Sequence, residues 1–267
     1  MTAVTGGASA RARARARGSV RGSVRWRLTW ATALRVLSQL RHDPRTVVML
    51  VVVPSLLMVL LRYVLDNAVA LNRFAPEFIG VFPFIIMFIV TAVTTQRERA
   101  RGTLERLMAM PLGKLDLLAG YAIAFGLVAL AQVGVVLLIS LTWLGVQLPG
   151  SVVPLLVVAV LDALLGMSLG LFASAFARTE FQAVQFMPAF VLPQALLCGI
   201  VVARDQMTDV LRWLSDVLPL SYAVDAMQQI SAGAAWSGTV TRDVGVILGF
   251  TVAALAGGAL TLRRRTR

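Results

Sequence analysis

The chain has 267 residues, of which 58% are hydrophobic and only 14% are charged. A soluble domain carries about 25% charged residues to cover its surface. This composition therefore excludes an ordinary soluble protein and indicates that much of the surface faces lipid. The formal net charge of +12 is a feature of many nucleic-acid-binding chains, but here the charged residues lie between long apolar stretches.

Residues 1–24 form a basic segment in which arginine alternates with other residues, chiefly alanine, from Arg11 to Arg17. We expect a disordered tail that contacts anionic lipid headgroups; nucleic-acid binding by this tail is the weaker alternative. A secretory signal peptide is not expected, because the basic region is too long and no small-residue cleavage site follows the first apolar stretch.

Residues 25–45 carry an apolar stripe at helical spacing that begins with Trp26 and Trp30, and arginines occupy other positions. The pattern predicts an amphipathic helix at the inner membrane surface, with the tryptophans at headgroup depth. Asp43 and Pro44 end this helix. Two roles remain open from the sequence: a simple interfacial anchor, or a lever between a cytoplasmic partner and the first membrane span.

Six apolar stretches reach or approach the length of about 20 residues that a helix needs to cross a bilayer. We expect an all-α integral membrane protein with a transmembrane domain over residues 46–262. The fifth stretch contains Pro188 and Pro193, so we expect a kinked or broken helix there. The six predicted spans cover residues 46–65, 78–95, 117–144, 152–177, 182–203 and 244–262.

Basic residues are distributed unequally between the two sides of this six-span arrangement. Twenty of the 25 lysines and arginines fall on the side that holds the N-terminal region, the loops after the second and fourth spans, and the tail 263–267. Short loops rich in Lys and Arg face the cytoplasm. Both ends of the chain are therefore predicted to be cytoplasmic.

The loop between the second and third spans, residues 97–113, is predicted to hold a charged helix that ends before Pro111 and Gly113. Gly102 lies inside that predicted helix, where glycine costs about 1 kcal/mol relative to alanine, so we expect a close packing contact at this position. The helix is suited to docking a partner; a merely solvated connector is the alternative.

The longest loop on the opposite side, residues 204–241, contains the apolar segment 218–227 with Pro219, Tyr222 and Asp225. It is too apolar for a free loop and too short to span a bilayer. We expect a helix that dips part of the way into the outer leaflet, buried in protein or lining a cavity.

Asp162 lies near the middle of the fourth predicted span. An ionisable group at this depth costs at least about 2.5 kcal/mol, which makes it a candidate functional residue. The alternative is a packing residue that is protonated or hydrogen-bonded, with Gln132 as its partner. Two small-residue pairs, Gly166/Gly170 and Gly245/Gly249, predict close helix–helix approach.

Several kinds of chemistry are absent from the sequence. There is no phosphate-binding P-loop, no metal-ligand cluster and no nucleophile motif, and the single cysteine, Cys198, excludes an intrachain disulfide. We expect a non-catalytic chain that binds no cofactor or metal. If ATP drives its function, another chain must bind the nucleotide.

Three segments of the sequence resemble the ABC-2 type family of exporter permeases, especially its daunorubicin-resistance branch. The first ends in R-H-D-P-R (41–45). The second is E-R-A-R-G-T-L-E-R-L (98–107), in which Arg101 stands at or next to a position where an acidic residue is common. The third comprises Leu-Pro (192–193), Cys-Gly (198–199) and L-P-L-S-Y-A-V-D-A (218–226), with Ala203 where a proline is often found.

The resemblance implies a permease fold of the type V exporter kind, in which two permease copies, identical or related, assemble with two copies of a separate ATPase that binds ATP and magnesium. Such a complex would export an amphiphilic drug, antibiotic or lipid-like substrate across a bacterial cytoplasmic membrane, and no nucleic acid is involved. The residues implied to contact the ATPase are Trp26, Trp30, Asp43 and Pro44 in the connecting helix and Glu98, Arg99, Arg101, Gly102, Thr103, Glu105 and Arg106 in the coupling segment.

Two other classes of function are alternatives to this one. An ATP-independent transporter or channel could use Asp162 as its ion site, although relays normally contain several intramembrane ionisable groups. An intramembrane enzyme is not supported, because the sequence has no Ser/His/Asp or metal-ligand arrangement. A neighbouring gene for an ATPase would favour the ABC exporter over both.

Overall fold

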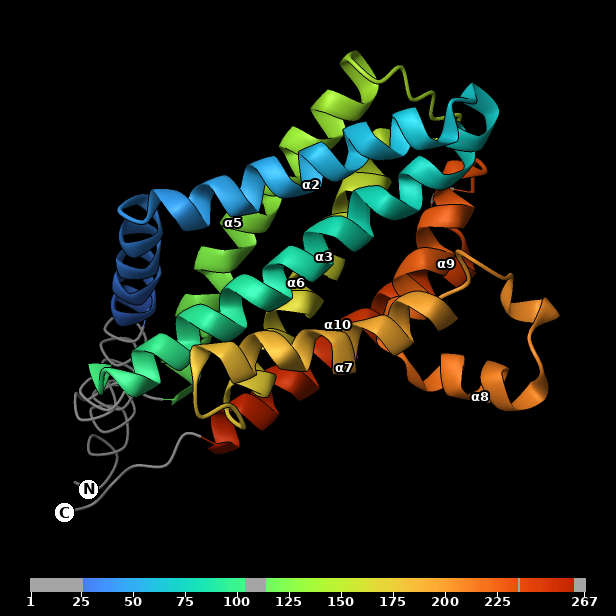
Figure 1. The fold of residues 1–267 in the computed structure, drawn as a ribbon. Coiled ribbons are helices and arrows are strands. Elements are labelled where there is room, and N and C mark those ends of the chain that lie inside the picture. Colours follow the sequence, from blue (N-terminus) through green and yellow to red (C-terminus); the bar gives the residue numbers. More distant parts are fainter. Residues whose placement is uncertain (1–25, 104–113, 235, 262–267) are drawn as a thin grey trace, which may run out of the picture.

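The computed structural model describes residues 26–103, 114–234 and 236–261, and every regular element in these ranges is helical, as the sequence predicts (Figure 1). A helix over residues 26–41 comes first. The elements that follow are α2 (Pro44–Leu65), α3 (Ala68–Ala100), α5 (Lys114–Thr142), α6 (Val152–Ser174), α7 (Glu180–Leu197), the 3-10 helix η1 (Arg204–Gln206), α8 (Asp209–Val217), α9 (Pro219–Ser231) and α10 (Gly238–Thr261).

Five of these helices, α2, α3, α5, α6 and α10, are long and apolar enough to cross a membrane. The remaining predicted span corresponds to α7, which has 18 residues and does not belong to this group. Its sequence contains Glu180, three glutamines and two prolines, which lower its apolar content. The crossing of a membrane by α7 therefore stays a prediction.

The long helices run back and forth between two ends of the molecule (Figure 1). One end, called here the basic end, holds helix 26–41, the Arg97–Arg101 end of α3, the α6–α7 connection with Arg178, and the end of α10. The other, called the α8 end, holds η1, α8 and the connections α2–α3, α5–α6 and α9–α10.

Helix α6 lies at the centre and packs along α3, with α10, α5 and α9 also against it. Two glycines bring α6 and α3 together. A Cβ atom at Gly166 or Gly170 would lie 2.3 Å from the carbonyl oxygen of Phe84 or Phe88, respectively, so the first predicted small-residue pair does mediate close packing.

The second small-residue pair, Gly245 and Gly249 of α10, differs from the first. Among the described residues, no atom lies within 4 Å of a Cβ added at either position. The close approach predicted for this pair is therefore wrong within the described chain. The sequence pattern is the same in both helices, but only α6 is surrounded by other helices on this face.

The segment 218–227 forms most of α9, which is buried against α3, α6 and α10. Pro219 occupies the first turn of α9, where its missing N–H leaves no hydrogen bond unsatisfied. By contrast, α8 exposes several apolar residues, including Trp213 and Val210. The depth of either helix in a membrane stays a prediction.

Candidate functional site

The predicted coupling residues lie at the basic end, where α3 ends against helix 26–41. Glu98, Arg99, Arg101, Gly102 and Thr103 are described. Glu105 and Arg106, which the sequence places in the same segment, lie outside the described residues, as does the rest of the predicted helix up to residue 113.

Glu98 is buried and joins three helices through its carboxylate. One oxygen, Oε1, accepts a hydrogen bond and forms an ion pair with Arg35 of helix 26–41 at 3.2 Å. The other, Oε2, accepts a hydrogen bond from the Tyr121 hydroxyl of α5. Arg35 also donates to the Tyr121 oxygen at 3.3 Å. Helix 26–41, α3 and α5 are therefore connected by one closed polar cluster.

Packing reinforces this cluster at Gly120, the residue before Tyr121. A Cβ atom at Gly120 would lie 2.6 Å from Cβ of Thr32 and 2.9 Å from the carbonyl oxygen of Thr29. Only glycine allows helix 26–41 to lie this close to α5. The same helix buries Ala33 and Val36 against the bundle, so apolar packing as well as the ion pair holds it there.

A second ion-pair network centres on Arg97, one residue before Glu98. Its Nε lies 2.8 Å from Oε2 of Glu180 at the start of α7, and its NH1 lies 3.8 Å from Oδ2 of Asp43. Asp43 caps α2: it accepts hydrogen bonds from the Thr46 hydroxyl at 2.7 Å and the Thr46 backbone N–H at 3.3 Å. The Thr46 hydroxyl, together with Arg97, lowers the pKa of Asp43 below its ordinary value.

The predicted continuous helix from 97 onward is wrong at Gly102. Helix α3 ends at Ala100 with Arg101 as its cap, and Gly102 has a φ of +66°, in the left-handed region. This conformation favours glycine and commonly ends a helix. Since nothing lies within 4 Å of a Cβ added there, the glycine serves the turn and not the close packing that the sequence suggested.

The residues around this turn are tied back to the bundle. Thr103 donates from its hydroxyl to the Glu98 carbonyl oxygen at 3.0 Å, and Arg99 donates to the Thr261 hydroxyl of α10 at 3.5 Å. Arg101 is exposed. The ends of α3 and α10 are thus joined at the basic end.

A hollow of about 360 Å³ opens at this end between helix 26–41 and the end of α3. Its lining includes His42, Asp43, Arg97, Arg101 and Thr103. A concave surface with charged groups of both signs can receive a polar side chain of another protein.

Trp26 and Trp30 stack on each other with ring centroids 6.4 Å apart and remain 62% and 44% exposed. They lie on the side of helix 26–41 that faces away from the bundle, and Pro44 starts α2 directly after the Asp43 cap. Their position in a membrane interface, or against a partner, stays a prediction.

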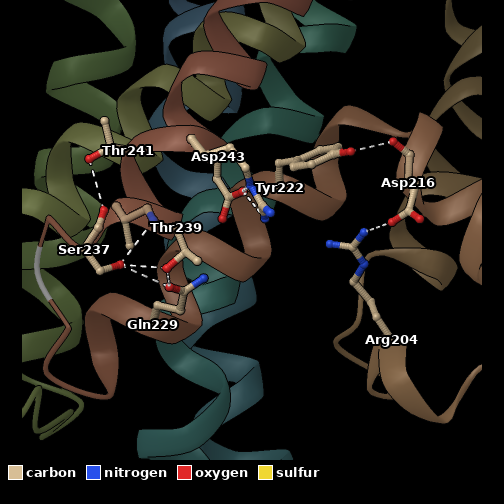
Figure 2. Close-up of polar contacts among 10 residues, drawn as sticks. Arg204, Asp216, Tyr222, Gln229, Ser237, Thr239, Thr241 and Asp243 are labelled. Atoms are coloured by element: carbon tan, nitrogen blue, oxygen red, sulfur yellow. Dashed lines mark hydrogen bonds and ion pairs between the residues drawn. The ribbon is translucent and has the colours of Figure 1, made fainter.

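At the α8 end, Tyr222 of α9 donates from its hydroxyl to the Asp216 carbonyl oxygen at 2.7 Å, and the Asp216 carboxylate pairs with Arg204 (Figure 2). These contacts hold η1 and α8 against α9. Asp225 lies on the same helix and lines a pocket of about 830 Å³. Pro219, Tyr222 and Asp225 thus belong to one helix, but the three residues do not form one cluster of contacts.

Asp162 and Gln132 are both buried, and the predicted hydrogen bond between them is absent. Neither carboxylate oxygen of Asp162 and neither side-chain polar atom of Gln132 has a hydrogen-bond partner among the described residues. Asp162 instead faces Gly80 of α3, where an added Cβ would lie 3.4 Å from its Oδ2.

Comparison with known proteins gives the family. The model of the family described as ABC-2 type transporter matches residues 27–231, which include all but the first residue of helix 26–41, the coupling residues and α9. The chain belongs to the ABC-2 type transporter family. This membership favours an ABC transporter subunit over the ATP-independent and enzymatic alternatives.

Three relatives illustrate the similarity. The "Probable multidrug ABC transporter permease YbhS" of Escherichia coli is 28% identical over 171 residues, covering 63% of this chain and 45% of the relative. "Probable multidrug ABC transporter permease YbhR" of the same organism is 30% identical over 155 residues, covering 58% of this chain and 42% of the relative. "Linearmycin resistance permease protein LnrN" of Bacillus subtilis is 26% identical over 185 residues, covering 67% of this chain and 48% of the relative. The matched part is less than half the length of each of these relatives.

Sequence reasoning identified Glu98 but missed its partners Arg35 and Tyr121, and it missed the Arg97–Glu180 pair. Tyr121 lies only four residues inside the predicted third span, and Glu180 lies three residues after the end of the fourth. Their positions near span ends were the available signal, because polar side chains there can reach one another at the same end of a bundle.

Proposed function

We propose that this ABC-2 family chain is the membrane-spanning permease subunit of an ABC exporter and that a separate subunit binds and hydrolyses ATP with magnesium. The family membership carries the proposal. Relatives named as multidrug and linearmycin-resistance permeases support export as the direction of transport.

In this proposal the chain has six spans, with α7 as the fifth, and the basic end faces the cytoplasm of a bacterial cell. The concentration of lysine and arginine at that end supports the orientation, since short cytoplasmic loops carry an excess of these residues. Two permease copies and two ATPase copies would form the exporter.

The contacts of Glu98 suggest how ATPase closure could reach the spans. The proposed docking surface comprises helix 26–41 and the segment that begins at Arg97. Because Glu98 connects helix 26–41 with both α3 and α5, a displacement of that helix would move the two spans together. Arg97 would extend the same displacement to α2 and α7 through Asp43 and Glu180.

The proposed substrate is an amphiphilic drug, antibiotic or lipid-like molecule. The α8 end, with α8 and α9 at the outer leaflet, would form its exit. Apolar side chains exposed on α8, such as Val210 and Trp213, support contact of this helix with lipid.

The test is a pull-down from membranes that co-express the chain and its neighbouring ATPase candidate, combined with an assay of ATP hydrolysis. We expect wild type to retain the ATPase and the Glu105→Arg variant to weaken or uncouple the complex, because the charge on the proposed docking segment is reversed. Asp209→Arg, a matched charge reversal in α8 at the other end, should behave as wild type. Transport that follows a proton or sodium gradient without any associated ATPase would overturn the proposal.

A further inference from the structure

A pocket of about 830 Å³ at the α8 end is separate from the coupling residues at the basic end. It lies between the start of α3, the α5–α6 connection, residues 199–206 and α9. Its walls combine apolar and charged residues, which distinguishes it from an ordinary gap between packed helices.

Glu77 of α3 lines this pocket and is only 3% exposed. Its Oε1 accepts a hydrogen bond of 2.7 Å from the Gln228 side-chain amide of α9. The second oxygen, Oε2, is buried and has no hydrogen-bond partner among the described residues. An ionised carboxylate with an unsatisfied oxygen is costly in such a place, and a donor carried by a ligand would remove that cost.

The other charges around the pocket favour a positively charged ligand. Asp205 and Asp225 line it together with Glu77, and the two arginines of its lining are Arg73 and Arg204. Arg204 is engaged elsewhere: it pairs with Asp216, which lies outside the pocket (Figure 2). Arg73 is exposed at the rim and lies over the Phe74 ring, 5.6 Å from its centroid.

Apolar groups adjoin these charges. Phe74, Pro149 and Ile200 contribute to the walls, and Val201 and Val202 are 69% and 43% exposed beside them. A ligand with an apolar body could cover these side chains while its charged group reaches Glu77.

We infer that this pocket binds an amphiphile with a protonated amine, whose ammonium group donates to the Glu77 carboxylate while its apolar part lies on the Ile200–Val202 wall. The inference rests on the proposed function and narrows its substrate class to cationic amphiphiles. Gln228 holds the Glu77 carboxylate in place from α9, so it acts as a positioning residue.

The experiment uses the full chain in zwitterionic-lipid nanodiscs, with any co-purifying ATPase retained. Fluorescence anisotropy measures the binding of dansylcadaverine, a primary alkylamine, and of its N-acetylated counterpart, which has nearly the same apolar body but no charge. Binding to empty nanodiscs is subtracted.

We expect wild type to bind the amine more tightly than the acetylated probe. Glu77→Gln preserves the shape of the side chain but removes its charge, so it should weaken amine binding by about tenfold or more and leave binding of the acetylated probe unchanged. Asp209→Asn makes the same change of charge at the same end of the molecule, outside the pocket lining, and should have no effect on either probe.

A second variant tests the inference by a gain of binding. Arg73→Gln removes the exposed cation at the rim and should raise the affinity for the amine by about threefold. The inference is overturned if Glu77→Gln binds both probes as wild type does, if it loses both equally, or, where Glu77→Gln does not fold, if Arg73→Gln leaves amine binding unchanged. Because the assay requires no ATP hydrolysis, failure of the ATPase to associate would count against the exporter proposal and not against this site.

Discussion

Glu98 depends on two partners from different helices, Arg35 and Tyr121. Removing one member of a buried ion pair leaves the other without compensation, whereas replacing both with apolar residues can be nearly neutral. Arg35 retains some exposure, so its isolated charge would keep part of its hydration. Comparing a single with a double substitution in this cluster therefore distinguishes the destabilisation caused by one unpaired charge from the stabilisation contributed by the ion pair.

For this reason we expect Glu98→Met to lower the free energy of unfolding by about 2 kcal/mol, measured by SDS titration of the purified protein. The double variant Arg35→Met, Glu98→Met should recover more than half of that loss. Arg101→Met, which removes an exposed arginine from the same end, should stay within about 0.5 kcal/mol of wild type. A double variant as unstable as Glu98→Met would show that the two residues do not depend on each other.

Asp162 presents the opposite situation, because neither of its oxygens has a partner among the described residues. Asparagine has the same shape without the charge, so Asp162→Asn should fold normally. Its amide N–H groups would find no more partners than the carboxylate does, and we expect reduced but not abolished activity, measured as transport by the complex with its ATPase. Complete loss of activity in a well-folded variant would instead support an ion-coupled mechanism.

At the scale of the elements, glycines of α6 allow its backbone to pack closely against the backbone of α3. Gly170→Ala would place Cβ 2.3 Å from the Phe88 carbonyl oxygen, which belongs to backbone and cannot rotate away. We expect a loss of about 2 kcal/mol in the free energy of unfolding. Gly249→Ala on α10 meets nothing within 4 Å and should be tolerated. Equal stability of the two variants in the same SDS titration would contradict this difference.

These elements also show how far the sequence alone reaches. Apolar length located five membrane-length helices and the helical segment around Tyr222, because these features depend on local composition. The same reasoning failed at Gly102 and at Gly245/Gly249, since a glycine pattern does not reveal whether a turn, a neighbouring helix or open space accounts for it. The Arg35–Glu98–Tyr121 cluster was out of reach because it joins residues up to 86 positions apart.

For the molecule as a whole, ion pairs between different elements occur at the two ends in the part of the chain that is described. They are Arg35–Glu98, Arg97–Asp43 and Arg97–Glu180 at the basic end, and Arg204–Asp216 at the α8 end. Between the ends the packing is almost entirely apolar. The two ends differ in the sign of their charge: in the described part of the chain, arginines outnumber carboxylates at the basic end and carboxylates outnumber arginines at the α8 end. This asymmetry is the basis for the proposed orientation.

The orientation and the crossing of α7 can be tested together, since α7 is the one long helix between Arg178 and Asp209. Both positions are exposed. In intact cells, a membrane-impermeant maleimide should label Asp209→Cys, whereas Arg178→Cys should react only after permeabilisation. The wild-type chain is the control, because its single cysteine, Cys198, is buried and should not react in either case. Labelling of both variants in intact cells would mean that α7 does not cross the membrane, and the reverse pattern would mean that it crosses in the opposite direction.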